Sequence, residues 1–267
     1  MGGASLQWEG VDLSEYDPKD RLSEVEYLHG VEERLSSSGV DAESELLKES
    51  VITGQLCEYA RRVNADAVFM SSHARGGLDR MIHCSVAERV MRDSQLPVFI
   101  LHPIDGERDI YVFPEIGHVL VRVDGSDLAG AVFGPVIDVA KVMDARVTLT
   151  SVVTPVVRGP RMVPIETDPG DGDETRASRH LEEMAVMLRG GGFDVDVVVV
   201  SAHDPVRGIV LVADSSGADL IAMATHGFKG VKRTLAGSVA DGVLQASPLS
   251  VMMIRPAHSG LNNESAE

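Results

Sequence analysis

Short apolar runs separated by amphipathic segments dominate the pattern of the chain. Runs of strand length lie at residues 118–123, 146–153, 194–201 and 249–254. The third is almost all Val, which is typical of a parallel strand buried on both faces. The pattern therefore predicts at least four strands of a sheet in the second half of the chain.

Helices are predicted between these runs. Apolar residues recur near a helical period from Leu128 to Val139, and a second helix is expected from about Thr175 to Leu188, before Gly190. Asp204–Pro205 predicts the start of a third, with Asp as N-cap and Pro at the first helical position. Strands that alternate with helices in this way indicate a doubly wound α/β fold with a parallel sheet.

The chain also contains an internal repeat with an offset of 153 residues. Two short strands, Asp66–Met70 and Asp219–Met223, are followed by His73 and His226, and the match continues without a gap. The matching pairs are Gly77 and Gly230, Arg80 and Arg233, Ser85-Val86-Ala87 and Ser238-Val239-Ala240, Ser94 and Ser247, Leu96 and Leu249, Val98 and Val251, and Pro103 and Pro256. Such self-similarity indicates two copies of one structural unit. We expect a first domain at residues 1–103, a linker at 104–116, a second domain at 117–256 and an acidic tail at 257–267.

A glycine-containing loop follows the strand of the second copy. It runs Ala224-Thr225-His226-Gly227, then nine residues, then Gly237-Ser238-Val239. This loop resembles that of the universal stress protein (UspA) family, whose ATP-binding members carry G-x-x-G, nine residues, then G-[ST]. The resemblance covers roughly residues 20–103 and 117–256. It implies two tandem doubly wound, Rossmann-like domains with strand order 3-2-1-4-5.

That strand order places a ligand crevice between strands one and four of the second copy, at their carboxyl ends. Asp124 ends the first strand, and by the resemblance it would hydrogen-bond the adenine or ribose of a nucleotide. Gly227 and Gly237 would let the backbone approach phosphate oxygens. Ser238 and Val239 open a helix, whose free N–H groups favour an anion. Tight turns and helix caps without a ligand are the alternative interpretation.

Two of the five lysines of the chain, Lys229 and Lys232, lie in this same loop. A cationic cluster in so acidic a protein suggests that the loop meets negative charge, although a solvated loop face is the alternative. Two positions depart from the family pattern: Ala224 replaces the first glycine, and Arg122 replaces the usual Pro two residues before the aspartate. His226 and His73 are interpreted as loop anchors rather than bases.

The first copy is degenerate at the corresponding positions, where Ser71, Ala74 and Cys84 replace the three glycines. Nothing before residue 20 resembles a strand ending in Asp-Gly-Ser. This copy is therefore predicted to lack strands one and two, which leaves strand three without a neighbour. Either the true start lies upstream, or a partner completes the half, or it is a decayed remnant. We expect no nucleotide here.

The two cysteines, Cys57 and Cys84, lie in the first copy and show no metal-ligand spacing. Both are interpreted as small buried residues rather than a disulfide. Cys84 also stands beside His83 at an expected helix start, which could lower a thiol pKa and make it reactive.

The charge balance is unusually acidic, with a net charge of −17 and nineteen arginines against five lysines. This composition suggests a halophilic, haloarchaeal protein that works in concentrated salt, with an ordinary acidic cytosolic protein as the alternative. No long basic stripe exists to bind nucleic acid. No run approaches the roughly 18 apolar residues of a membrane span, and Met1–Gly10 does not resemble a signal peptide. We expect a soluble, cytoplasmic protein.

The function that the resemblance implies is regulation of a stress response through an adenine nucleotide, ATP with or without Mg²⁺, bound in the second domain. The alternative is an interaction module of the same fold that binds no nucleotide. The sequence has no Walker-type loop, no evident general base and no metal cluster, so at most a slow ATPase is expected. The family resemblance also implies pairing of the two fifth strands, Pro97–Leu101 and Leu249–Ile254, within one chain. A homo-oligomer is expected as well.

Overall fold

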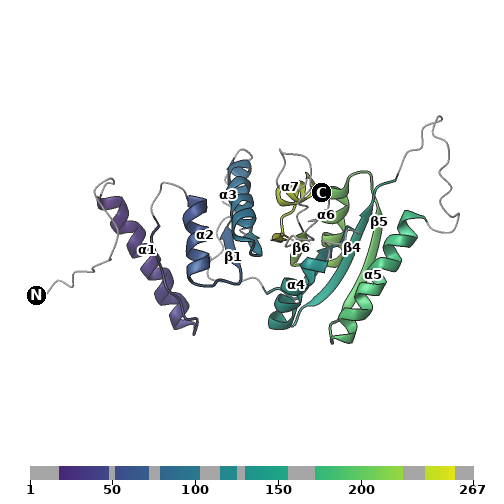
Figure 1. The fold of residues 1–267 in the computed structure, drawn as a ribbon, viewed down its shortest axis with the longest axis horizontal. Helices are drawn as coiled ribbons and strands as arrows, with labels where there is room; N and C mark the ends of the chain where they lie inside the picture. Colours follow the sequence, from purple (N-terminus) through teal and green to yellow (C-terminus); the bar gives the residue numbers. More distant parts are fainter. Residues whose placement is uncertain are drawn as a thin grey trace, which may run out of the picture. The chain divides into compact units, whose positions relative to one another are not determined.

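The computed structural model of the chain describes residues 18–47, 52–71, 79–102, 115–124, 130–155, 172–224 and 238–255. It contains helices and strands that alternate along most of this length (Figure 1). In chain order they are α1 (Pro18–Ser37), α2 (Ile52–Arg62), β1 (Val68–Ser71), α3 (Asp79–Ser94), β2 (Val98–Leu101), β3 (His118–Arg122), α4 (Gly130–Met143), β4 (Arg146–Val153), α5 (Asp173–Gly190), β5 (Val195–Ser201), α6 (Pro205–Ser216), β6 (Leu220–Ala224), α7 (Ser238–Ala246) and β7 (Ser250–Ile254).

The chain divides into two compact units, Met1–Tyr59 and Ala60–Glu267. In the first unit, α1 ends where Val40 N donates to the carbonyl of Leu35 and Gly39 adopts a left-handed φ of 83°. Residues 40–47 form no strand, although the repeat aligns them with β5. The predicted domain boundaries remain a prediction.

One seven-stranded sheet lies in the second unit, in the order β1-β2-β7-β6-β3-β4-β5. All neighbouring strands run parallel except β2 and β7, which pair antiparallel with Phe99 opposite Met252. The predicted α/β class with a mostly parallel sheet is therefore confirmed. The five strands of residues 118–254 lie in the order β5-β4-β3-β6-β7, so β3 stands in their centre.

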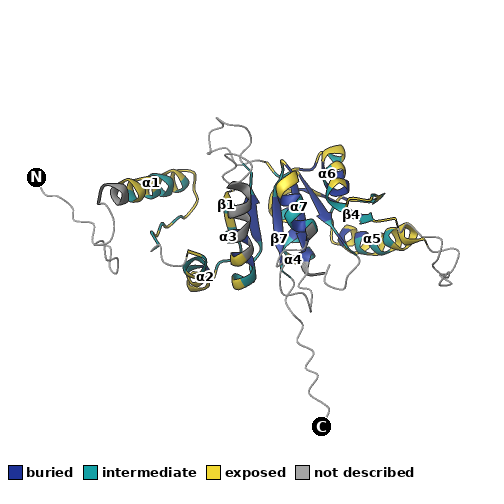
Figure 2. Ribbon diagram, turned by 90° about the horizontal axis from the view of Figure 1, so that it is seen from above, coloured by how far each residue is buried: buried dark blue, intermediate teal, exposed yellow. Residues whose placement is uncertain are grey.

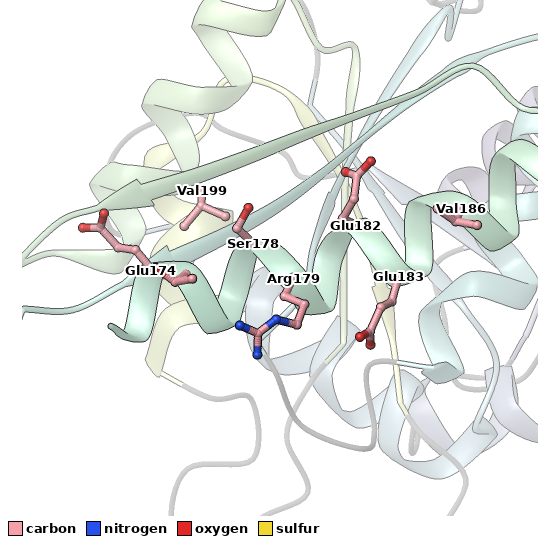
Figure 3. Close-up of a pocket in the computed structure, with 8 residues that line it drawn as sticks. Glu174, Ser178, Arg179, Glu182, Glu183, Val186 and Val199 are labelled. Atoms are coloured by element: carbon pink, nitrogen blue, oxygen red, sulfur yellow. The ribbon is translucent and has the colours of Figure 1, made fainter. Parts of the chain in front are cut away.

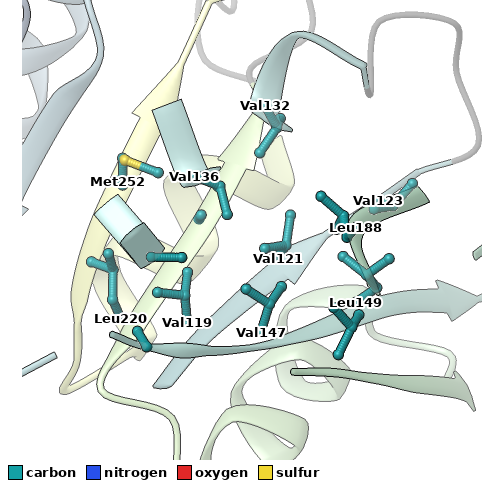
Figure 4. Close-up of a cluster of buried hydrophobic side chains, with 14 of the residues drawn as sticks. Val119, Val121, Val123, Val132, Val136, Val147, Leu149, Leu188, Leu220 and Met252 are labelled. Atoms are coloured by element: carbon teal, nitrogen blue, oxygen red, sulfur yellow. The ribbon is translucent and has the colours of Figure 1, made fainter. Parts of the chain in front are cut away.

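Helices α4 and α5 cover one face of this sheet. Their apolar residues, which include Val136 and Leu181, join a buried cluster with strand residues such as Val121 (Figure 4). One row of register partners crosses this face through all seven strands: Phe69, Phe99, Met252, Ala222, Val121, Leu149 and Val197. The row shows that both repeats contribute to one continuous apolar surface.

Helices α6 and α7 pack on the opposite face, and two glycines allow them to approach closely. A Cβ on Gly208 would lie 2.9 Å from Cγ1 of Val152 in β4. A Cβ on Gly242 of α7 would lie 2.5 Å from Cγ2 of Val206 in α6. The middle strands are consequently buried on both sides, while α5 keeps an exposed outer face (Figure 2).

Several local predictions agree with the structure. β4 spans the predicted residues 146–153, and α6 begins as expected, because the Asp204 side chain accepts from the N–H groups of Val206 and Arg207. α5 extends two residues beyond each predicted end, to Asp173–Gly190. Cys57 is buried, as predicted.

The prediction that Cys84 stands at a helix start is wrong. α3 begins at Asp79, so Cys84 lies inside the helix. Free N–H groups and the positive end of the helix dipole are confined to the first turn, so the expected reason for a reactive cysteine at this position does not apply.

Candidate functional site

The carboxyl ends of β3 and β6 meet at one edge of the sheet. The two strands pair in parallel, with Arg122 opposite Met223. Asp124 follows β3, and Ala224 is the last residue of β6. Both residues are close to buried: the side chain of Asp124 is 9% exposed, and Ala224 is 8% exposed. The structure therefore brings these two predicted site residues to the same edge.

The amino ends of the same strands are anchored by polar contacts. Asp219 Oδ2 accepts from the backbone N–H groups of Gly117 and His118, at 3.0 and 2.9 Å. The His118 ring is buried between the Gly217 carbonyl, 3.2 Å from Nδ1, and Thr148 Oγ1, 2.7 Å from Nε2. These contacts hold β3 and β6 in register, which positions their far ends.

Arg122 forms an ion pair with Asp124, a contact that the sequence analysis did not predict. Its Nη1 donates to Asp124 Oδ2 at 3.0 Å, and the arginine side chain is 16% exposed. Burial lowers the pKa of the guanidinium, and the carboxylate beside it acts in the opposite direction. The aspartate is thus already engaged by a neighbouring cation. Alternate residues of an extended chain point to the same side, so the spacing of Arg122 and Asp124 could have predicted their contact.

Thr150 is the register partner of Arg122 on β4. It is fully buried, and its Oγ1 has no hydrogen-bond partner among the described residues. Buried hydroxyls are nearly always hydrogen-bonded in native proteins. The hydroxyl beside the ion pair is therefore an unsatisfied polar group at this end of the sheet.

The phosphate side of the predicted site is described only in part. Ser238 is the first residue of α7, and Val239 is half-buried in its first turn. Gly227, Lys229, Lys232 and Gly237 lie outside the described residues, as do the side chain of Ser238 and the ring of His226. A helix that begins at Ser238 presents free N–H groups at its first turn, as the sequence predicted.

The corresponding place in the first repeat is built differently. Ser71 ends β1 where Ala224 ends β6, but α3 begins at Asp79 and passes through Ser85, the counterpart of Ser238. Ser85 therefore does not lie at a helix start and offers no first-turn N–H groups. The expectation of no nucleotide in the first repeat stays a prediction.

Two further kinds of feature are absent from the described residues. No three His, Cys, Asp or Glu side chains there converge to hold a metal ion. None of the described helices combines the length and apolar character needed to cross a membrane.

The fold, a mostly parallel sheet with helices on both faces, is that of a doubly wound α/β protein. The model of the universal stress protein family matches residues 4–102 and 115–255, and the chain belongs to this family. The two matched segments correspond to the two repeats, so this is a tandem member.

Individual relatives support the assignment. A universal stress protein of Mycobacterium tuberculosis is 28% identical over 199 residues, which cover 72% of this chain and 62% of the relative. A putative universal stress protein of Staphylococcus haemolyticus is 27% identical over 144 residues, 52% of this chain and 84% of the relative.

Among solved structures, a universal stress protein from Archaeoglobus fulgidus superposes with a TM-score of 0.66 at 23% identity. The match covers 95% of this chain and 83% of that chain. This likeness shows that the two proteins share a fold.

Proposed function

We propose that the second repeat binds an adenine nucleotide, ATP in the first instance, and that the protein acts as a nucleotide-dependent regulator of a stress response. The observation that carries this proposal is that Asp124 and Ala224 lie at the carboxyl ends of two neighbouring parallel strands, β3 and β6. In doubly wound sheets, ligands bind at this edge where the winding reverses.

The residues present fit such a ligand. A carboxylate accepts hydrogen bonds from an adenine amine or ribose hydroxyls, and the first turn of a helix donates to phosphate oxygens. The orphan hydroxyl of Thr150 supplies one further polar group at this end of the sheet. Gly227, Gly237, Lys229 and Lys232 complete the proposed site on the grounds of their sequence positions. Mg²⁺ would reduce the repulsion among the phosphate charges.

The second candidate function is an interaction module that binds no nucleotide, and the ion pair favours it. Arg122 donates to Asp124 Oδ2 at 3.0 Å, so one acceptor site of the carboxylate is already taken by a charge-assisted hydrogen bond. Ala224 adds a Cβ where the family motif has glycine. The two candidates differ in whether Asp124 also accepts a hydrogen bond from a ligand.

Calorimetric titration of ATP with Mg²⁺ in molar KCl tests the proposal. We expect saturable binding near one nucleotide per chain, weakened at least about tenfold by Asp124→Asn, because an amide accepts hydrogen bonds less strongly than a carboxylate. Gly237→Val should abolish binding. Asp138→Asn, on the exposed side of α4, is the control for the loss of one charge.

The decisive negative result is the absence of binding heat at several temperatures in folded protein that carries no bound nucleotide. That result would favour the interaction module. One universal stress protein has been solved in complex with cAMP, so cAMP belongs among the test ligands.

Three broader expectations belong to the same proposal. The antiparallel pairing of β2 with β7 supports a pair of repeats joined within one chain through their fifth strands. An incomplete first repeat is supported by the missing counterparts of β3 and β4 in the described residues. A cytoplasmic, salt-adapted homo-oligomer rests on composition and family resemblance.

A further inference from the structure

The β5 edge of the sheet is an exposed strand beside an acidic groove. β5 is the last strand of the sheet, and no strand pairs with its outer side among the described residues. A groove of about 760 Å³ runs between this strand and α5 (Figure 3). It is lined by Glu174, Thr175, Ser178, Arg179, Glu182, Glu183, Val186 and Val199.

The hydrogen bonds of β5 show which of its backbone groups point outward. Val147 N donates to the Asp194 carbonyl at 2.9 Å, and Ala202 N donates to the Val153 carbonyl at 3.0 Å. Even-numbered residues therefore face β4, since alternate residues of a parallel strand direct their N–H and C=O groups to the same side. Val197 and Val199 direct theirs to the outer edge, where an added strand would pair.

The chain itself shows which chemistry this edge accepts. The Arg189 guanidinium donates to the outward carbonyl of Val195 from Nε at 3.0 Å and from Nη2 at 2.7 Å. The same guanidinium is held by Glu182, 2.6 Å from Nη1. A cationic side chain thus already bridges a groove carboxylate and the strand edge at one end.

The charge of the groove selects among occupants. Three glutamates line it against one arginine. Pairing of β5 with β5 of a second copy would bring two such acidic grooves together, and like charges at an interface oppose association. A basic strand would instead place lysine or arginine side chains beside Glu174, Glu182 and Glu183 while its backbone pairs with Val197 and Val199.

We propose that the β5–α5 edge is a docking site for an extended basic segment of a partner protein, which adds to the sheet as an eighth strand. Main-chain hydrogen bonds provide the affinity, and the glutamates select basic side chains at alternate positions. The site does not include the carboxyl ends of β3 and β6, so it is independent of nucleotide binding.

The test uses the full chain at low salt and a capped peptide of alternating Lys and Val, about eight residues long to match a strand. We expect saturable binding, with amide NMR shifts and slowed hydrogen exchange at Val197 and Val199. The same peptide with N-methyl groups on all its backbone amides keeps its charge but has no N–H left to pair at either edge, and it should bind at least about tenfold more weakly. Equal binding of the two peptides would overturn strand addition.

Protein variants provide a second line of evidence. Glu174→Gln/Glu183→Gln should weaken the peptide several-fold and leaves the Glu182–Arg189 contact in place. The matched control is Glu24→Gln/Glu26→Gln on the exposed side of α1, which removes the same charge and should change nothing. Equal weakening by both pairs would show general charge attraction and contradict the proposal.

Val199→Pro removes an outward N–H without breaking a bond to β4, a position at which proline is tolerated on edge strands. It should abolish peptide binding while ATP titration is unchanged. Sedimentation that shows a dimer broken by Val199→Pro, with no peptide binding by the wild-type chain, would replace the proposal with self-pairing.

Discussion

The two repeats share a sequence pattern but differ in what surrounds the same strand. In the second repeat, β6 lies between β3 and β7, and Ala222 is fully buried. In the first repeat, β1 lies at the edge of the sheet, and Phe69, the counterpart of Ala222, is 63% exposed. A large aromatic occupies the position whose equivalent is covered, because no strand among the described residues pairs with the outer side of β1. The burial of a strand thus depends on its neighbours more than on its own sequence.

The helices show the same contrast. Gly208 and Gly242 let α6 and α7 approach each other and β4, whereas the aligned residues of the first repeat are Gln55 and Arg89. Large polar side chains at both positions are incompatible with such close packing. The first repeat has therefore lost the glycines of its core as well as those of its loop.

The largest effect is expected from substitutions at two equivalent positions, Ala222 in the covered strand β6 and Phe69 in the edge strand β1. Ala222→Phe should lower the free energy of unfolding by about 3 kcal/mol, because the ring must enter a filled core. Phe69→Ala should lower the free energy of unfolding by only about 1 kcal/mol, because the main loss is the stacking of its ring on Phe99 at a centroid distance of 4.4 Å. Urea unfolding followed by circular dichroism measures both. Equal costs would show that the first repeat covers its strand as well as the second does.

A smaller effect on the free energy of unfolding is expected at Gly242 and at Arg89, its counterpart in the first repeat. Gly242→Ala gains helix propensity but forces its Cβ against Val206, so we expect a net loss of about 1–2 kcal/mol. Val206→Ala in the same chain should restore part of this stability, because it removes the methyl groups that clash. Arg89→Ala, at the exposed matching position of α3, should change the free energy of unfolding by no more than about 0.5 kcal/mol. A double-mutant cycle on unfolding free energies provides the coupling, and additive losses would contradict a direct contact.

The smallest effect concerns an exposed ion pair within the first repeat, next to a hydrogen bond from the second repeat. Arg92 donates to Asp93 at 2.8 Å and lowers the pKa of that carboxyl, while Arg255, after β7, donates to the Arg92 carbonyl at 3.0 Å. A carboxyl with a lowered folded-state pKa stabilises the protein above its unfolded pKa, and this stability is lost as the pH falls through the folded value. The pair is exposed, so the contribution should stay below about 0.5 kcal/mol. Acid unfolding of Asp93→Asn should lack this small slope below pH 4, and a slope identical to that of the wild type would exclude the contact.

Much of the second repeat could be predicted because its signals are local. The valine run of β5, the Asp204–Pro205 start of α6 and the glycines after α5 each act within a few residues. The strand-end position of Asp124 followed from the same pattern. The ion pair with Arg122 was not predicted from the family pattern, although alternate residues of a strand point to the same side. The start of α3 was misplaced because the helix was aligned with the start of α7, although Gly77 and Asp79 mark an earlier start.

The sequence by itself determined the repeat, the class of fold and the residues that end the central strands, since apolar period, caps and turn residues act over short distances. Only the tertiary structure decided which strands become edges, that residues 40–47 form no strand, and that Arg122 and Asp124 pair out of water. These outcomes depend on which groups find partners across the sheet. Strand pairing and burial are properties of neighbours that lie far apart along the chain.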